Sequence, residues 1–262
     1  MASTGKASTR GGRADWSSKP RSRDLPAPIV QEFRQLFDDA KKFKDEAGRT
    51  VASAKWGVYA FFDYDGEPIY VGQTNERLST RLNRHLTNQR TDAVAMRILD
   101  VFEVAEVKMW PIWRFQDRSS KDREARAILD AHEYSAYLQA IEESKFGAIL
   151  NEKIPPLSDR VDLPQAYSFP LISEETRRER GHADVRIARR AETISRLAAV
   201  AHERGEVSEG LRRVIVIQAV RLAHLSAVRL AEVEGRPSPE PTAISVEGLV
   251  GSVLYERSSP FE

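Results

Sequence analysis

The sequence contains no cysteine, and this absence removes several kinds of chemistry at once. Without thiols the chain forms no disulfides, binds no zinc through cysteine and offers no thiol nucleophile. It also lacks any run approaching the roughly 18 consecutive apolar residues of a membrane-spanning helix. The first residues contain no apolar segment typical of a secretory signal. We therefore expect a cytoplasmic protein with no membrane partner.

A strong net charge is missing as well. The 262 residues include 40 Lys and Arg against 39 Asp and Glu, so the formal net charge is only +1. The protein as a whole therefore does not attract nucleic acid strongly, and any basic surface must be local. With 41% hydrophobic and 30% charged residues, the composition is that of a soluble globular protein. The length allows one large domain or two small ones.

Changes in composition along the chain predict five parts. The parts are a flexible basic tail at 1–25, a helical arm at 26–55, a mixed α/β domain at 56–160, a helical extension at 161–235, and a Pro-rich linker with a C-terminal element at 236–262. No repeat of fixed period is present. The α/β domain is the part whose residues indicate chemistry.

Apolar periodicity predicts the secondary structure of these parts. Helices are expected near 28–46, 76–86, 120–144, 173–204 and 207–234, a hairpin over 56–72, and a third strand within 101–115. Pro111 indicates that this third strand lies at a sheet edge or beside a bulge. The predicted fold is α+β, with a small three-stranded antiparallel sheet flanked by helices, an N-terminal helix and a C-terminal helical extension.

The hairpin stretch GVYAFFDYDGEPIYVGQ carries two tyrosines, Tyr59 and Tyr70, around an Asp-Gly turn signal. Side chains alternate along a strand, and a connecting loop of two or four residues places both phenols on one face. Gly57 and Gly72 would leave room for a bulky group beside them. The tyrosines are therefore either paired core aromatics or part of a site.

The next predicted helix bears on this choice. Arg81 and His85 are four residues apart and so share one helix face. A separate row of leucines can bury against the sheet: Leu78, Leu82 and Leu86. An arginine beside two phenols can hold a phosphate and favour a phenolate. The alternative for Arg81 and His85 is an ordinary solvated helix face.

In this order the residues resemble those of the GIY-YIG nuclease superfamily. The chain has Gly-Val-Tyr ending at Tyr59, ten intervening residues, Tyr-Val-Gly beginning at Tyr70, and then RLNRH. The resemblance continues to Glu133 on the following helix and to Asn151 after it, and covers roughly residues 55–155. The PIYVG and RLNRH segments are most similar to the type II restriction endonuclease branch.

The resemblance implies a metal-dependent endonuclease whose catalytic domain is 56–160. Family members hydrolyse DNA phosphodiesters with one divalent metal held by a single carboxylate, which suits Mg²⁺, with Mn²⁺ as a substitute. Glu133 would be the metal ligand, and Tyr59 would help to remove a proton from the attacking water. Tyr70 and His85 would hydrogen-bond the phosphate, the water or Tyr59. Arg81 would stabilise charge that develops on the phosphate. Three residues would be structural: Gly57, Gly72 and Asn151.

Two departures leave alternatives open. Many family members carry Lys where this chain has Gln73, so the role of that cation is either vacant or supplied by Arg77 or Arg84. On the helix of Glu133, Glu124 lies nine residues earlier and Glu142 nine later. Both are more simply surface charges.

The flanking helices suggest how DNA is held. Candidates for contact with the DNA backbone are Arg77, Arg84, Arg177, Arg178 and Arg186. For the Arg-rich helix after 173, the alternative is a solvated, salt-bridged surface. The helix at 211–231 is apolar over much of its circumference, so either the preceding helix or a second subunit must cover it.

Cutting both strands of duplex DNA favours a homodimer or homotetramer. A restriction enzyme would also have a cognate DNA methyltransferase. The alternatives are a repair, homing or phage-defence nuclease that acts with partners, or an inactive DNA-binding protein.

Overall fold

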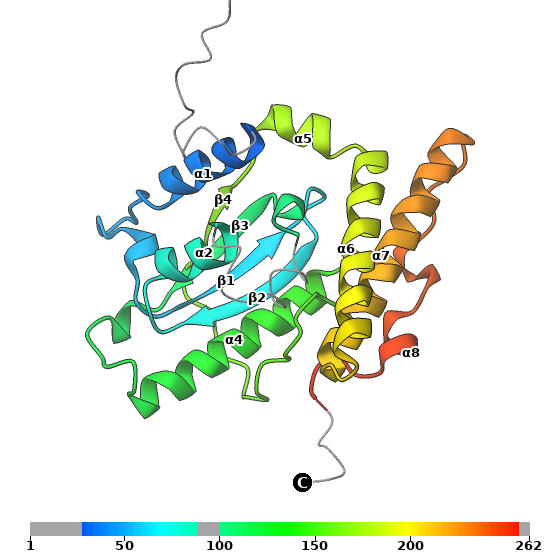
Figure 1. The fold of residues 1–262 in the computed structure, drawn as a ribbon. Coiled ribbons are helices and arrows are strands. Elements are labelled where there is room, and N and C mark those ends of the chain that lie inside the picture. The colour runs from blue at the N-terminus through cyan, green and yellow to red at the C-terminus, as the bar shows by residue number, and fades with distance from the viewer. Residues whose placement is uncertain (1–27, 88–99, 257–262) are drawn as a thin grey trace, which may run out of the picture.

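A computed structural model describes residues 28–87 and 100–256, and a four-stranded antiparallel sheet lies at its centre (Figure 1). The strands are β1 Gly57–Phe62, β2 Pro68–Thr74, β3 Glu106–Pro111 and β4 Tyr167–Pro170, in the spatial order β2-β1-β3-β4. The predicted basic tail at 1–25 lies outside the described residues.

Seven α-helices surround the sheet in the described part of the chain. They are α1 Pro28–Ala40, α2 Leu78–Thr87, α4 Arg123–Glu143, α5 Glu174–Arg180, α6 Ala183–Arg204, α7 Glu209–Val233 and α8 Val246–Val250. Single-turn 3-10 helices cover Val51–Ser53, Val101–Glu103, Trp113–Phe115 and Pro241–Ala243. The predicted α+β class, with helical regions at both ends, is confirmed.

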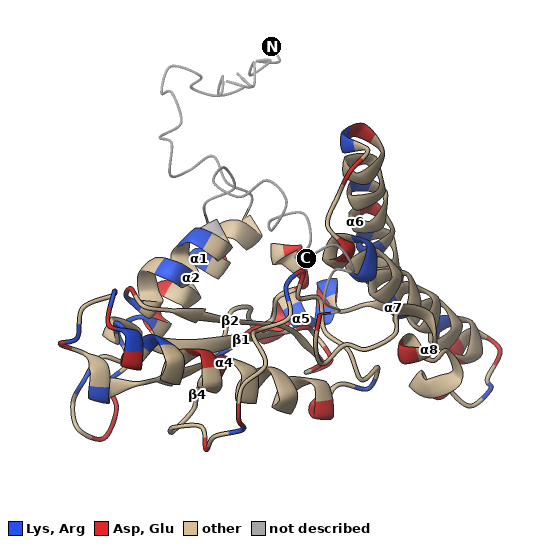
Figure 2. Ribbon diagram, turned by 90° about the horizontal axis from the view of Figure 1, so that it is seen from below, with Lys and Arg blue, Asp and Glu red and all other residues tan. Residues whose placement is uncertain are grey.

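A hydrophobic core lies on each face of the sheet. Successive side chains of β1 point to opposite faces and therefore belong to different cores. Tyr59 and Phe61 pack in a core with residues of α1 and α2, whereas Val58 and Ala60 pack in a second core with α4. Figure 2 shows the sheet between α1 and α2 on one side and α4 on the other. Helix α4 packs against the edge strand β2 and also contacts β1.

A fourth strand extends the sheet beyond the three that we predicted. β4 pairs with β3, with Val107 opposite Phe169, and lies past residue 160, where the α/β domain was expected to end. β3 is consequently an interior strand over Glu106–Met109, but its pairing with β4 stops before Pro111, which has a neighbouring strand on one side only. Pro111 is the last residue of β3, opposite Gly57 on β1.

The single helix predicted over 173–204 is two helices. The chain turns at Gly181, where a Cβ atom would lie 2.3 Å from the carbonyl oxygen of Arg177. His182 then caps α6 by accepting a hydrogen bond from the backbone N–H of Asp184. The break gives α6 a new direction, and α6 and α7 lie side by side in both Figure 1 and Figure 2.

Helix α7 is long and apolar enough, by length and composition alone, to cross a membrane. Its Val214, Ile217 and Val220 are buried in the main core, and α6 packs along it. Arg221, in the middle of the helix, is also buried. The preceding helix therefore covers part of α7, and 33% of the most apolar stretch of α7 is buried. Leu230 and Val233, near its C-terminal end, remain exposed.

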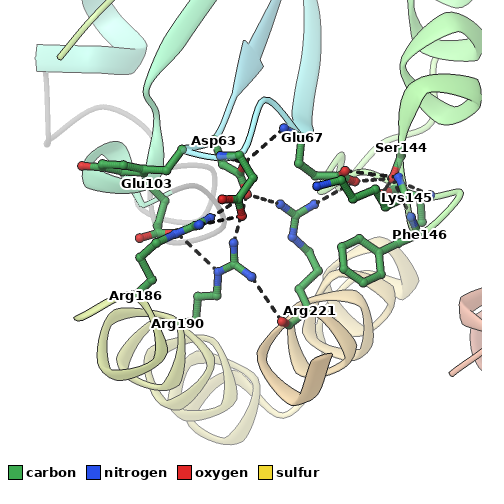
Figure 3. A network of polar contacts seen from close by, with 12 residues as sticks. Asp63, Glu67, Glu103, Ser144, Lys145, Phe146, Arg186, Arg190 and Arg221 are labelled. Atoms are coloured by element: carbon green, nitrogen blue, oxygen red, sulfur yellow. Dashed lines mark hydrogen bonds and ion pairs between the residues drawn. The ribbon is translucent and has the colours of Figure 1, made fainter. Parts of the chain in front are cut away.

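A buried ion network joins α6 and α7 to the turn of the β1–β2 hairpin (Figure 3). Asp63, the first residue after β1, accepts hydrogen bonds from Arg186, Arg190 and Arg221 at 3.0, 3.0 and 2.9 Å. Glu103 lies 3.4 Å from Arg186 Nε and 3.3 Å from Arg190 Nε. Several charges of each sign are thus removed from water together, which anchors the C-terminal helices to the hairpin.

This network overturns one prediction about DNA contacts. The side chain of Arg186 is only 1% exposed, and its guanidinium binds Asp63, Asp65 and Glu103. Arg186 is therefore not a DNA-backbone ligand but part of the anchor. The sequence pattern of alternating charges at 173–204 had suggested only a solvated surface or a DNA contact.

Candidate active site

The strand register places both tyrosines on one face of the sheet, as predicted. Tyr59 lies opposite Gly72, and Tyr70 lies opposite Phe61, two residues further along the same face. The ring centroids of Tyr59 and Tyr70 are 6.3 Å apart. Tyr59 is fully buried, whereas Tyr70 is partly exposed.

Position 72 has no room for a side chain, because the Tyr59 ring lies directly over it. A Cβ atom at Gly72 would lie 2.6 Å from the Tyr59 hydroxyl oxygen, closer than any ordinary contact. At Gly57 a Cβ atom would meet the Trp110 carbonyl oxygen at 2.9 Å and Leu78 at 3.0 Å. The space beside both glycines is therefore filled by side chains and backbone of the protein itself.

Helix α2 brings Arg81 and His85 to the hydroxyl of Tyr59. The Tyr59 oxygen lies 2.9 Å from His85 Nε2, and Arg81 Nε donates a hydrogen bond to it at 3.3 Å. The leucines of the other α2 row are all buried, as predicted: Leu78, Leu82 and Leu86. The Tyr59 oxygen accepts from Arg81, and the Tyr59 hydroxyl donates to His85 Nε2 in the tautomer in which that nitrogen carries no hydrogen. Tyr59 is thus held between a cation and an imidazole.

Tyr59 is protonated in this environment. Burial raises the pKa of its phenol well above 10, and the neighbouring Tyr70 acts in the same direction. The positive charge of Arg81 lowers the pKa but does not offset the burial. A general base at this position was expected to need an ionised phenol. Arg81 alone does not lower the pKa of Tyr59 enough to produce it.

Glu133 lies on α4, and its side chain is partly buried. Burial together with the negative charge of Asp130 raises its pKa to about 7. Arg81 and the polar groups of Gln73 oppose this rise in pKa. The negative charge of Glu133 in turn contributes to the raised pKa of Tyr59.

Gln73 reaches helix α4 from strand β2. Its Nε2 donates a hydrogen bond to Asp130 Oδ1 at 2.7 Å. The position where many family members carry Lys is therefore filled by a neutral amide. Sequence reasoning missed Asp130, although its spacing of three residues before Glu133 places it on the same helix face.

The other carboxylates of α4 lie on the surface. Glu124 is 67% exposed beside Arg118, and Glu142 is 57% exposed and pairs with Arg160. Exposed ion pairs of this kind contribute little to stability and do not fix the position of a buried group. Their positions favour Glu133 as the carboxylate of the site.

The remaining basic candidates differ in their surroundings. Arg84 pairs with Glu76, and Arg177 donates a hydrogen bond to the Tyr64 carbonyl at 2.5 Å. Arg77 and Arg178 are exposed. Of the five basic residues expected to contact DNA, Arg77 and Arg178 are the two most exposed to solvent, whereas Arg84 and Arg177 are partly buried and Arg186 is buried.

Asn151 holds the outer edge of β2. Its Oδ1 accepts from the Val71 N–H at 3.0 Å, and its Nδ2 donates to the Val71 carbonyl at 2.8 Å. The amide thus takes the place of a neighbouring strand next to Tyr70 and Gly72. This position is that of a structural anchor for the strand that carries the site.

The donor set fits a cation held by few protein ligands. Within residues 28–87 and 100–256, no group of three or more His, Asp or Glu side chains is arranged to hold a metal ion. Burial and the nearby negative charge of Asp130 raise the pKa of Glu133, and a divalent cation bound beside it would act in the opposite direction. A single carboxylate with water and phosphate oxygens is typical of Mg²⁺ sites.

Residues 55–132 match the family described as the GIY-YIG catalytic domain. No curated protein and no solved structure matches the chain. The matched range contains Tyr59, Tyr70, Arg81 and His85 and stops one residue before Glu133. A GIY-YIG catalytic domain is therefore present and indicates an endonuclease, while the position of Glu133 comes from the structure.

Proposed function

We propose that the protein is a metal-dependent endonuclease that hydrolyses phosphodiester bonds of duplex DNA. The observation that supports this proposal most is the convergence of Arg81 and His85 on the Tyr59 hydroxyl. Tyr59 comes from strand β1 and the other two residues from helix α2, while Glu133 on α4 interacts electrostatically with Arg81 and Tyr59. A buried phenol between a guanidinium and an imidazole can handle both a proton and a phosphate.

The arrangement supports a proton relay rather than a free phenolate. As a water oxygen attacks phosphorus, its proton passes to the Tyr59 oxygen while the Tyr59 hydrogen passes to His85 Nε2, 2.9 Å away. The P–O bond to the leaving group breaks, and solvent protonates the released oxygen. Because the two transfers are coupled, the raised pKa of Tyr59 is no obstacle.

The remaining groups act on the phosphate. Arg81 lies next to the Tyr59 oxygen and would bind a phosphate oxygen there, stabilising charge that develops in the transition state. Tyr70, partly exposed beside both Tyr59 and His85, would orient the phosphate or the water. Glu133 would hold a divalent cation, Mg²⁺ or in its place Mn²⁺, which would supply Lewis-acid stabilisation of the phosphate.

Cleavage of duplex DNA by the purified protein with Mg²⁺ tests this proposal. Arg81→Ala and Glu133→Ala should each lower the single-turnover rate by about 10²-fold or more. Glu142→Gln, on an exposed carboxylate of the same helix, is the control and should cleave at the wild-type rate. Cleavage by Glu133→Ala at the wild-type rate would contradict the assignment of the carboxylate. Absence of wild-type cleavage with any divalent metal would contradict the enzyme itself.

For the biological role we propose a sequence-specific type II restriction enzyme acting as a homodimer or homotetramer in the cytoplasm. Two exposed apolar residues at the C-terminal end of α7 offer a surface for a second copy: Leu230 and Val233. A restriction enzyme requires a DNA methyltransferase that protects the same sequence. Digestion of a defined phage genome with mapped ends tests this role, since cuts at one recurring sequence support it and dispersed cuts contradict it.

A further inference from the structure

Strand β2 contains one residue that has no partner on β1. Phe61 lies opposite Tyr70, but the next residue of β1, Phe62, lies opposite Pro68. Ile69, between them, is therefore the extra residue of a β-bulge. Ile69 and Tyr70 are consecutive, and yet both pack against the core that contains Phe61. Consecutive side chains of an unbroken strand would point to opposite faces, so the bulge changes the face that β2 residues beyond it occupy.

The turn of the hairpin has a register that differs by one residue from that of the site. The Asp63 N–H donates to the Glu67 carbonyl at 2.9 Å, so these two residues face each other across a loop of three residues, 64–66. Gly66 has a φ of +70°, the left-handed conformation that a three-residue loop uses at its last position. We expected a loop of two or four residues, which would place both tyrosines on one face without a bulge.

An unbroken ladder that continued from this turn would remove Tyr70 from the site. The pairing would place Tyr70 opposite Ala60, by continuation of the register at the turn. Ala60 packs in the core with α4, so Tyr70 would point toward α4 and away from Tyr59. Val71 would replace Gly72 beneath the Tyr59 ring, where there is no room for a side chain. The bulge therefore supplies the shift that brings the two tyrosines together.

The register at the turn is fixed from outside the hairpin. Asp63 lies in the buried ion network of α6 and α7 (Figure 3). Glu67, on the other side of the loop, is buried and accepts hydrogen bonds from Ser144 Oγ at 2.5 Å and from the Lys145 N–H at 3.1 Å. Because both residues of this pair are held, the difference of one residue has to be taken up within β2.

The register at the site is fixed along the outer edge of β2. The Leu150 N–H donates to the Ile69 carbonyl at 2.8 Å, so the carbonyl of the bulged residue is paired outside the β1–β2 ladder. Both backbone polar groups of Val71 are bound by the Asn151 amide. Two adjacent residues, Leu150 and Asn151, thus hold the bulge and the strand next to it.

We propose that the β-bulge at Ile69 positions Tyr70 in the active site, with Leu150 and Asn151 as the positioning residues that hold it. This inference rests on the proposed function, because it gives Tyr70 a part in the reaction. Bulges beside active sites commonly redirect a side chain in this way. The C-terminal helices also contribute, since their ion network with Asp63 fixes the register that the bulge corrects.

Two deletions of a single β2 residue test this proposal, because each removes the bulge and only one should move Tyr70. Deletion of Ile69 leaves the pairs on both sides of the bulge unchanged, so Tyr70 stays beside Tyr59. Deletion of Val71 also gives an unbroken ladder, but Tyr70 then lies opposite Ala60 and points to α4. Nuclear Overhauser effects between the Tyr59 and Tyr70 rings, whose centroids are 6.3 Å apart, should persist in the first variant and vanish in the second.

Single-turnover cleavage adds a readout that a merely structural bulge would not change. Tyr70→Phe should lower the rate about 10-fold or more in the wild-type chain, and by a similar factor in the Ile69 deletion. In the Val71 deletion, Tyr70→Phe should have no further effect, because Tyr70 is already outside the site. A further loss of the same size in both deletions would overturn the proposal, as would ring contacts that persist in both.

A point substitution and the wild-type protein keep the proposal testable if the deletions do not fold, which circular dichroism checks. Asn151→Ala releases Val71 and should lower cleavage severalfold in the wild-type chain but not in Tyr70→Phe. An equal loss in both backgrounds would show that Asn151 does not act through Tyr70. In the wild-type protein, cross-strand Overhauser effects should join Phe61 to Tyr70, and pairing of Ala60 with Tyr70 would overturn the proposal.

The same measurements separate this inference from the proposed function. A wild-type protein with the Tyr59–Tyr70 ring contact but no cleavage of DNA with any divalent metal would contradict the proposed function alone. A wild-type protein that cleaves DNA, with Tyr70 opposite Ala60, would contradict this inference alone.

Discussion

The β1–β2 hairpin has charged groups near both ends, and the two ends differ in how the charges are balanced. At the turn, Asp63 is closed in by Arg186, Arg190 and Arg221 and is almost completely buried. Toward the open end, Asp130 and Glu133 lie together on α4 with Arg81 as the opposing charge that acts on Glu133, and all three residues are partly exposed.

This difference in charge balance distinguishes a structural anchor at the turn from a candidate site at the open end. Where each buried charge has opposite charges around it, the network holds two parts of the chain together. Where negative charge exceeds positive charge at a partly open edge, pKa values shift and ligands can complete the balance. The same residue types, Arg with Asp or Glu, thus serve stability at one end of the hairpin and binding at the other.

Asp63→Asn should break the anchor and have the largest effect on stability. The variant leaves three buried guanidinium groups with one carboxylate fewer, so the free energy of unfolding should fall by about 3–5 kcal/mol. Urea denaturation measures this change. Asp159→Asn, on an exposed carboxylate, is the control and should unfold like wild type. A loss as small as that of the control would show that the network is not an anchor.

The anchor should also weaken in acid. Burial by itself would raise the pKa of Asp63, but Arg221, Arg186 and Arg190 together hold it below the usual value. A lowered folded-state pKa means that the stabilisation is present above the unfolded pKa of about 4 and is lost as the pH falls through the folded value. The stability difference between wild type and Asp63→Asn should therefore shrink below about pH 4. A difference that grows in acid would contradict this sign.

Gly72→Ala should distort the site with a smaller cost to stability. The new methyl group would meet the Tyr59 hydroxyl at 2.6 Å, so the ring must move, at a cost of about 1–3 kcal/mol. Cleavage should fall because the phenol leaves its place between Arg81 and His85. In a Tyr59→Phe background the same substitution should cost less stability, since the closest clashing atom is gone. Equal cost in both backgrounds would show that Tyr59 is not what excludes a side chain at Gly72.

Arg178→Gln should have the smallest effect, on DNA affinity alone. Arg178 is exposed on α5, so a phosphate contact there would be lost without a change in folding. The slope of log affinity against log salt concentration should decrease in magnitude by about 1. Fluorescence anisotropy with labelled duplex at several salt concentrations measures this slope. An unchanged slope would remove Arg178 from the DNA surface.

The sequence was sufficient to predict the hairpin and much of the candidate site. Alternation along a strand is a local rule, so it placed Tyr59 and Tyr70 on one face before the register was known. Helical spacing likewise separated Arg81 and His85 from the leucine row that α2 buries. These predictions succeeded because each depends on residues within one element or one turn.

Features that depend on distant residues were missed. β4 has only four residues, and it becomes a strand because β3 offers an edge about 60 positions earlier, Val107 to Phe169. Arg186 was assigned to DNA because its buried partner Asp63 is 123 positions away. Asp130 was overlooked because its partner Gln73 lies on another element, 57 positions earlier. No local sequence pattern predicts contacts between residues that are so far apart in the chain.

The central claim is that Tyr59 takes part in proton transfer, and its most direct test compares two buried tyrosines. Tyr59→Phe removes the hydroxyl between Arg81 and His85, while Tyr137→Phe removes one that donates to the Val253 carbonyl on the other side of the sheet. Each loses hydrogen bonds worth about 1 kcal/mol of stability. Single-turnover cleavage of duplex DNA with Mg²⁺ should fall about 10²- to 10⁴-fold in Tyr59→Phe and stay near wild type in Tyr137→Phe. Cleavage by Tyr59→Phe at the rate of Tyr137→Phe would contradict the account.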